Sequence, residues 1–562
     1  MKVEATSRWV GIIAGIGASF TSILITISSN NDPVNVPKLV ALASFAGALA
    51  GIWVLNFKSA INSGRTIPII SLLMLIGMVA SIVFTREPFV QIFYGVTGRN
   101  TGALTYLVLI LILCSSQLLK FGKHLKYIAF GLYFATVWNT AYGLLQVTGH
   151  DPVDWTNPYN NFIGTFGNPD FSSAFMGIGI TALIPILFSK ATNLLNRIAI
   201  ASVTVIGAYE IETSNAIQGK VILVIGSFLY LLFYLRIRFK SQIPLIGATA
   251  IGVFGFIISL LGTLQIGPLK EFLYKPSVTL RGFYWDAGLS MFKDSPFFGK
   301  GFDSYGDYYT QYRSASSVLS PGSIETVTNS AHNVVIDMLT SGGLIFTLPY
   351  LALVLVLLFR ITKKFMQNEI RNMYQQSLYI AWVGYMFQSF VSINQIGLAV
   401  WGWLLLGVVY ASTNNNFIYD DDNVKSNKLK IKKSSRSLVL TPKEFIASSA
   451  GLILLLVISL PPQIADANWM SAMRSRDINK LIDASFAFPL SSWRLAETSR
   501  VLLQNGFKDQ ALEIAKKAVE FNPRSYNAWI TLGNNPLTSE SQKKEIKKKL
   551  SYLDPRDPEW KR

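Results

Sequence analysis

The sequence predicts an all-α protein that crosses a membrane with about 12–13 transmembrane helices and carries a small helical domain outside it. Three observations predict this fold class. Hydrophobic residues make up 51% of the 562 residues and charged residues only 15%, whereas about a quarter of a soluble domain is charged. Long apolar runs recur along the chain, and lysine and arginine are divided unequally between the segments that join these runs.

The apolar runs have the length of membrane-spanning helices. A helix that crosses the hydrocarbon core needs roughly 20 mostly apolar residues. We place thirteen candidate spans, at residues 9–28, 38–56, 67–85, 103–119, 127–146, 171–189, 196–212, 217–235, 243–265, 341–359, 376–393, 397–412 and 444–462. The first run is followed by no small-residue cleavage site, so we interpret it as a retained helix rather than a signal peptide.

The net charge of +18 is explained by membrane topology. If the N-terminus lies inside, the short inner segments contain 23 lysine and arginine residues and the short outer segments contain four. Such an excess of positive charge on the inner side sets the orientation of membrane proteins. We therefore expect a cytoplasmic N-terminus, an external C-terminal tail and no nucleic acid partner.

Composition divides the chain into four segments. Residues 1–412 form a membrane domain in which one outer loop, residues 266–340, is far longer than its neighbours. Residues 413–443 are polar and lysine-rich, and we expect a solvated cytoplasmic linker there. Residues 444–462 form the thirteenth span, which carries residues 463–562 outside. Long loops within compact domains are usually functional, so the loop at 266–340 is the first region in which to look for chemistry.

The tail has the pattern of a helical repeat. Pro489, Pro523 and Pro555 are spaced 34 and 32 residues apart, and small residues lie at helical spacing between the first two. This pattern resembles a tetratricopeptide helix pair, and the alternative is an ordinary helical hairpin. Either structure favours a surface that docks a protein partner or an acceptor, rather than a catalytic domain.

The few cysteines and histidines restrict the chemistry. Cys114 is the single cysteine and lies in an apolar span, so we expect no disulfide framework. No cluster of cysteine and histidine predicts a metal site, and we expect neither a metal nor a cofactor. Of the three histidines, we expect His124 to be a solvated inner residue and His150 to be a turn residue.

His332 is the best candidate for proton transfer. It lies in an Asn-Ser-Ala-His-Asn sequence at 329–333, where the long outer loop returns to the membrane. A neutral imidazole at this boundary can accept a proton near pH 7. The alternative is a structural histidine at the start of a helix.

Arg281 is a second candidate, expected at the start of a short helix that lies against the membrane surface. Trp285, Leu289 and Phe292 form an apolar stripe at helical spacing after it. Free backbone N–H groups at a helix start favour an anion, and a guanidinium can bind phosphate through two parallel hydrogen bonds. The alternative is an interfacial arginine that extends to water.

Two glycine-containing motifs precede membrane spans on the outer side. Arg99 lies in Gly-Arg-Asn-Thr-Gly at 98–102, and Asn168 lies in Gly-Thr-Phe-Gly-Asn-Pro-Asp at 164–170. Glycine and proline allow the backbone to approach a ligand closely, but they also form ordinary turns. Each motif alone therefore indicates little.

In their order and spacing these motifs resemble the O-antigen ligase family, which includes O-antigen ligases, polysaccharide polymerases and bacterial O-oligosaccharyltransferases. The resemblance covers about residues 85–410. It implies the membrane fold of the lipid-sugar glycosyltransferases and a donor glycan carried on undecaprenyl diphosphate. It also implies transfer without a metal at the outer face of the cytoplasmic membrane.

By this resemblance His332 matches the family's essential histidine and Arg281 matches an arginine at the donor diphosphate. Arg99 is a further candidate for the diphosphate. Asn333 and Asn168 are expected in the loops that contact substrate.

The sequence departs from the family pattern before the eighth span. The family has a second essential arginine there, in a Ser-Arg-Gly sequence, whereas this chain has no arginine between residues 213 and 220. Lys220 is expected to supply the charge and Gln218 neutral hydrogen bonds, but neither reproduces the bidentate geometry of a guanidinium. The substitution raises the alternative of reduced or lost activity.

Several alternatives stay open at this stage. The acceptor can be lipid A core, another glycan, a wall polymer or a protein hydroxyl. A glycan or lipid transporter is expected to place polar residues near the bilayer midplane, where Asn139 and Gln146 are the clearest. A non-catalytic scaffold that presents its tail leaves the motifs around Arg281 and His332 unexplained.

Overall fold

The computed structural model describes residues 2–561 except for residues 28, 154, 156–158, 160–161, 240, 321–326 and 419–438. The described residues form helices and connecting segments without any β-strand, apart from one isolated bridge between Phe121 and Ile418. The predicted all-α class is confirmed. The central part of the linker predicted at 413–443 lies outside the described residues.

Nine helices among the described residues are long and apolar enough to cross a membrane. They are α2 (Asn35–Leu55), α4 (Thr66–Phe84), α7 (Leu125–Val147), α8 (Pro169–Leu187), α9 (Leu194–Thr213), α10 (Ile217–Arg238), α11 (Ile243–Thr263), α16 (Val334–Met366) and α19 (Pro442–Ser475). Four further helices lie at the other predicted spans: α1 (Lys2–Ile23), α6 (Ala103–Ser115), α17 (Met373–Ser389) and α18 (Ile396–Ser412). The chain is therefore a multi-pass membrane protein, as the sequence predicts.

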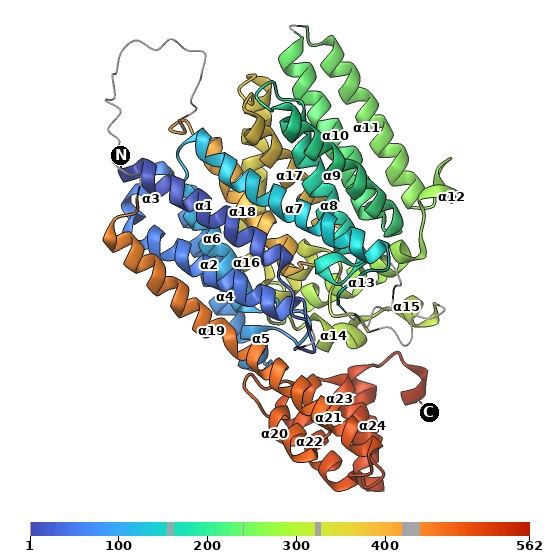
Figure 1. Ribbon diagram of the computed structural model, residues 1–562. Coiled ribbons are helices and arrows are strands. Elements are labelled where there is room, and N and C mark those ends of the chain that lie inside the picture. The colour runs from blue at the N-terminus through green and yellow to red at the C-terminus, as the bar shows by residue number, and fades with distance from the viewer. Residues whose placement is uncertain are drawn as a thin grey trace.

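The helices differ in what they contact. All residues of α18 are buried, and this helix packs against α1, α6 and α17 in the centre of the bundle. In α11, by contrast, only Leu245 and Gly262 are buried, and most of its exposed side chains are apolar, as expected for contact with lipid. Figure 1 shows α11 at the margin of the bundle.

The helix α19 belongs to the bundle because it packs closely against α2. A Cβ atom at Gly47 would lie 2.1 Å from the carbonyl oxygen of Gly451, and one at Gly51 would lie 2.0 Å from that of Ala447. Small residues spaced four apart allow such close contact between helices in membranes. The tail that follows α19 is thereby fixed to the membrane domain.

The long loop at 266–340 folds into four helices at one end of the bundle, which we call the loop end. These are α12 (Lys270–Leu273), α13 (Pro276–Asp294), α14 (Tyr305–Tyr312) and α15 (Ala315–Leu319). A small core formed by Tyr284, Tyr305, Tyr309, Ala331 and Ile336 joins α13 and α14 to the start of α16. The loop is therefore a packed layer in its described parts.

A turn after α13 attaches this layer to a kink in α16. The N–H group of Lys300 donates to the carbonyl oxygen of Thr340 (2.6 Å), and that of Leu344 donates to Pro296 (2.8 Å). Gly343 has a φ of +62° at the kink, and a Cβ atom there would lie 2.3 Å from the backbone of Phe297. Only glycine combines this close approach with a positive φ. The turn fixes the position of the loop layer relative to α16.

The tail folds into five α-helices after α19, at the same end of the molecule as α13, α14 and α15 (Figure 1). They are α20 (Ile478–Ser485), α21 (Ser492–Gln504), α22 (Lys508–Phe521), α23 (Tyr526–Gly533) and α24 (Glu540–Leu553). The helix pairs α21 with α22 and α23 with α24 pack on each other, and Ala511, Ala515 and Ala518 are fully buried. The resemblance to a tetratricopeptide repeat stays a prediction.

The tail contacts the loop layer through α14 and the residue after it. Arg313 forms a fully buried ion pair with Asp554, and the hydroxyl of Thr310 donates to the carbonyl oxygen of Leu553 (2.9 Å). The guanidinium of Arg524 lies 3.7 Å from the ring centre of Tyr308. The helix α14 is thus held between the membrane domain and the tail.

Candidate functional site

His332 lies in a tight turn immediately before α16. Its φ is +53°, and its N–H group donates to the hydroxyl oxygen of Ser330 (2.9 Å). Asp337, in the first turn of α16, accepts hydrogen bonds from the Ser330 hydroxyl (2.7 Å) and the Ala331 N–H group (2.8 Å). One carboxylate therefore fixes the turn that presents His332.

The two predicted asparagines cap helices next to the site. The side-chain oxygen of Asn333 accepts the N–H groups of Val335 (3.0 Å) and Ile336 (3.1 Å) at the start of α16. The side-chain oxygen of Asn168 accepts the N–H group of Asp170 (2.8 Å) at the start of α8. Capping satisfies backbone donors that a helix start leaves free, and these bonds give both asparagines a structural role.

Arg281 lies in the second turn of α13, so the predicted position at the helix start is wrong. The helix begins at Pro276, because proline suits the first turn, where its missing N–H group is not required. The guanidinium of Arg281 lies 3.3 Å from the carboxylate of Asp170 and donates to the Ser277 hydroxyl (3.3 Å). Its buried Nε atom has no hydrogen-bond partner among the described residues.

Arg99 reaches the same region from the turn between α5 (Phe89–Tyr94) and α6. Its Nη1 atom donates to the carbonyl oxygen of Asn329 (2.6 Å), three residues before His332. Its Nε atom lies 3.6 Å from the carboxylate of Asp303. That carboxylate also accepts the N–H groups of Val96 (2.9 Å) and Thr101 (3.1 Å), so Asp303 fixes the turn that carries Arg99.

The three candidate side chains converge electrostatically. Burial, followed by the positive charges of Arg281 and Arg99, lowers the pKa of His332 to about 3. The ring of Tyr284 lies 5.4 Å from the imidazole and contributes to its enclosure. At physiological pH His332 is consequently neutral and can accept a proton.

Lys220 and Gln218 lie on α10, which is separated in the sequence from Arg99, Arg281 and His332. The Lys220 ammonium lies 2.8 Å from the Glu212 carboxylate; the lysine side chain is partly exposed and the glutamate side chain is largely exposed. Gln218 is buried, and neither atom of its amide has a hydrogen-bond partner within the described part of the chain. The connection before α10 contacts the start of α13, because Lys275 donates to the carbonyl oxygen of Asn215 (3.0 Å).

Sequence reasoning missed Asp303 and Asp337, and it named Asn329 only as the first residue of the motif around His332. Together with Arg99 they line a polar cavity of about 10 Å³, a volume that accommodates about one water molecule. The sequence signals that could have identified these residues are the position of Asp303 two residues after Gly301 and the position of Asp337 in the first turn of a membrane helix. His124 also differs from expectation, because it is buried and lies 2.9 Å from the Ser7 hydroxyl.

The chemistry available is that of a neutral base under the influence of two nearby cations. Within the residues that the structure describes, no group of three or more His, Cys, Asp or Glu side chains is arranged to hold a metal ion. An anion beside either guanidinium would be stabilised, and a hydroxyl beside His332 could pass its proton to the imidazole.

Comparison with known proteins supports the resemblance seen in the motifs. Residues 214–351 match the family described as O-Antigen ligase. The matched segment is less than half of the chain and contains Gln218, Lys220, Arg281 and His332, whereas Arg99 and the tail lie outside it. No curated protein matches the chain.

Proposed function

We propose that the protein is a membrane glycosyltransferase, O-antigen ligase-like, which moves a glycan from undecaprenyl diphosphate to an acceptor hydroxyl. The reaction takes place at the outer face of the cytoplasmic membrane. The observation that carries this proposal is the placement of His332 beside α13 and the turn of Arg99. The ring of Tyr284, three residues after Arg281, lies 5.4 Å from the imidazole, and Arg99 donates to the carbonyl oxygen of Asn329 (2.6 Å), three residues before His332. The family match at 214–351 supports the same reaction class.

His332 acts as the base in this reaction. The acceptor oxygen attacks the anomeric carbon of the donor sugar, and the bond from that carbon to the diphosphate oxygen breaks. The electron pair of that bond remains on the diphosphate, and the acceptor proton passes to His332. Because the imidazole is neutral before donor binds, it has a free lone pair for this proton.

Arg281 and Arg99 bind the diphosphate and stabilise the negative charge that grows on it as it leaves. Their charges also depress the pKa of His332 in the free protein. A bound diphosphate offsets those charges, so donor binding raises the pKa of His332 and makes it a stronger base. The site is thereby tuned to act only when donor is present.

The identity of the acceptor distinguishes an O-antigen ligase from a polysaccharide polymerase and from a protein O-oligosaccharyltransferase. A polysaccharide polymerase or a protein O-oligosaccharyltransferase uses the same base and the same anion site with a different hydroxyl. The protein reconstituted with a labelled lipid-linked glycan should release undecaprenyl diphosphate and label an added acceptor. A transporter would move the labelled lipid without this release, and a scaffold would do neither.

Replacing Arg281 by lysine is expected to be nearly as damaging as replacing it by alanine. Loss of a donor to a developing anion costs about 10²–10³-fold in kcat, and an ammonium cannot make two parallel hydrogen bonds. Initial rates of donor release measure the effect. Lys220→Ala should reduce the rate less than Arg281→Ala but more than Lys270→Ala, the matched control at an exposed lysine that begins α12. Full activity of Arg281→Lys would show that charge alone suffices.

The orientation is expected to follow the positive-inside rule. A reporter fused after residue 430 should lie in the cytoplasm, and one fused after residue 500 should lie outside. The side of the membrane on which each reporter lies can be measured with reporter enzymes whose activity depends on the compartment. Finding the two reporters on the same side would remove α19 from the set of spans and place the tail away from the proposed site.

A further inference from the structure

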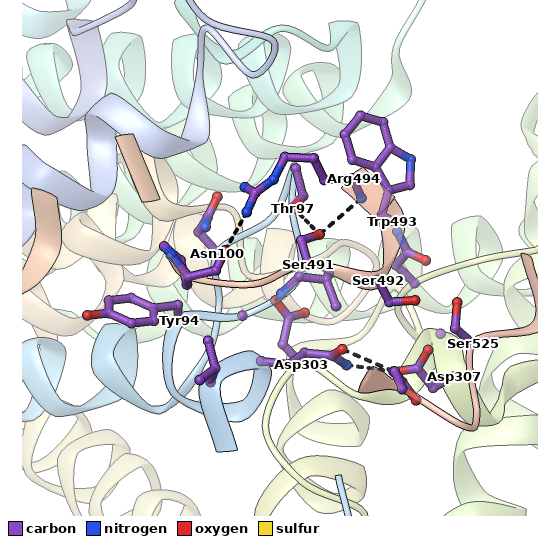
Figure 2. Close-up of a pocket in the computed structure, with 18 of the residues that line it drawn as sticks. Tyr94, Thr97, Asn100, Asp303, Asp307, Ser491, Ser492, Trp493, Arg494 and Ser525 are labelled. Carbon is purple, nitrogen blue, oxygen red and sulfur yellow. Dashed lines mark hydrogen bonds between the residues drawn. The ribbon is translucent and has the colours of Figure 1, made fainter. Parts of the chain in front are cut away.

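A cavity of about 150 Å³ lies where the tail meets the loop end of the bundle. Figure 2 shows its walls, with Tyr94, Asn100 and Asp303 on the membrane domain and Ser492 and Trp493 on the tail. Neither part encloses this space alone. The cavity therefore exists only because the tail is docked.

Two buried polar atoms in the walls lack partners. Asn100 is 4% exposed and Ser492 is 5% exposed, and both line the cavity. The side-chain oxygen of Asn100 and the hydroxyl of Ser492 have no hydrogen-bond partner among the residues that the structure describes. Burying such groups without a partner is unfavourable, so their placement points to a ligand that supplies hydrogen bonds from within the cavity.

The other polar groups of the walls indicate which ligand fits. Asp303 and Asp307 contribute carboxylates, and Asp307 accepts hydrogen bonds from Gln91 (2.6 Å) and Asn522 (3.1 Å). The guanidinium of Arg494 donates to backbone carbonyl oxygens, among them that of Pro489 (2.7 Å). The two carboxylates thus add negative charge to the walls, and the one arginine among the lining residues is already engaged. Such a cavity favours neutral hydroxyl donors and disfavours an anion.

The aromatic residues add an apolar surface to this polar lining. Tyr94 and Trp493 both line the cavity, and Trp493 is 40% exposed. A sugar ring presents hydroxyls at its edge and C–H groups on its faces, which match acceptors and aromatic surfaces respectively. A pocket that is partly apolar and has a few fixed polar groups is the usual form of a small-ligand site.

We propose that this junction cavity is a subsite that binds a neutral sugar unit of a glycan substrate. Two residues connect it to the candidate site, because Asp303 and Asn329 line both this cavity and the smaller one beside Arg99. Asn329 lies three residues before His332. The identification of the sugar as part of a substrate rests on the proposed function, whereas the binding of a neutral saccharide does not.

Saturation-transfer NMR on the full-length protein in lipid nanodiscs tests the binding directly. The probes are N,N′-diacetylchitobiose, a neutral disaccharide, and glucose 1-phosphate, an anionic sugar. We expect transfer to the neutral disaccharide and much less to the phosphate. Ser492→Leu fills the cavity and should remove the signal, whereas Ser541→Leu, on the exposed face of α24, should retain it.

Thermal unfolding of both variants separates a blocked cavity from a misfolded tail. If Ser492→Leu unfolds at a lower temperature, Asn100→Gly replaces it, because glycine keeps the positive φ of +55° at this position and removes the side chain that carries the amide. Equal transfer to both probes, or a signal that survives both substitutions, overturns the subsite. Transfer to a serine-rich peptide but to neither sugar also overturns it, in favour of a protein acceptor.

The kinetic comparison assigns the sugar to one substrate. A higher KM for acceptor in Ser492→Leu places the acceptor glycan in the cavity, and a higher KM for donor places the donor glycan there. Saccharide binding without any release of undecaprenyl diphosphate would leave the subsite standing and overturn the proposed function. Glycan transfer by a protein that binds neither sugar would overturn the subsite alone.

Discussion

Replacing His332 by alanine is expected to abolish glycan transfer while the protein still folds and inserts. A positioned base contributes about 10²–10⁴-fold in rate, and the structure holds His332 in a fixed turn, where Arg281 and Arg99 influence its pKa. The hydrogen bonds of that turn use the backbone of residues 331 and 332 and the Ser330 and Asp337 side chains. Alanine therefore removes the base and leaves those bonds available. Release of undecaprenyl diphosphate in the presence of acceptor measures the loss.

His150→Ala is the matched control, because His150 is an exposed histidine in another loop of the chain. Its transfer rate should equal that of the unaltered protein. A His332→Ala variant with the same rate as His150→Ala would show that another group takes the proton. Near-equal loss of expression and of transfer would instead indicate a structural histidine.

The pH dependence gives the same residue a second test. The pKa of His332 is about 3 in the free protein, so the imidazole is already deprotonated at every pH above about 5. We expect kcat/KM for donor to be insensitive to His332 protonation between about pH 5 and about pH 8, since this parameter reports the free protein. A decrease of kcat/KM below pH 7 that follows an ordinary histidine titration would contradict the buried position of the ring, provided that His332→Ala removes this decrease.

The membrane helices were predictable because each apolar run reports directly on contact with lipid or with other apolar helices. The start of α16 shows the limit of this signal. The run predicted a span from residue 341, whereas the helix begins at Val334. Its first turns carry Asp337 and Thr340, which are buried within the protein and do not follow the pattern of a lipid-facing segment. Polar residues enclosed by other parts of the chain cannot be recognised from hydropathy.

The candidate site was predictable only where short motifs carried it. His332 and Arg281 stand in local sequences that resemble a known family, and the charge of Arg281 contributes to the lowered pKa of His332. Asp303 acquires its role by bonding to Val96 and Thr101, more than 200 residues earlier in the chain. No local pattern records such a contact. The burial of His124 against Ser7, 117 residues away, was unpredictable for the same reason.

The docking of the tail is the largest feature that the sequence left open. A helical tail can recruit a partner at a distance or pack against the loop that precedes it. The structure shows contacts of the second kind, centred on Arg313 and Asp554, which are separated by 241 residues. Both side chains are 1% exposed, and Asp557 lies 3.9 Å from the same guanidinium.

Removing the arginine from this buried pair is expected to undock the tail. Arg313→Met leaves the Asp554 carboxylate buried without its cation, and breaking a buried ion pair in this way costs about 3–5 kcal/mol. Hydrogen exchange of the α14 amides should then accelerate by up to about 10³-fold, because each 1.4 kcal/mol corresponds to a factor of ten. Deuterium uptake of α14, followed by mass spectrometry, is the measurement.

The double variant Arg313→Met with Asp554→Leu separates docking from catalysis. Replacing both charges by apolar side chains of similar size is often neutral, so exchange in α14 should return close to that of the unaltered protein. Because α14 begins two residues after Asp303, which fixes the turn of Arg99, undocking should lower donor hydrolysis and acceptor transfer together. The double variant should recover both activities. If α14 becomes exposed in Arg313→Met while both activities persist, the tail serves recruitment alone and the geometry of Arg99 does not depend on it.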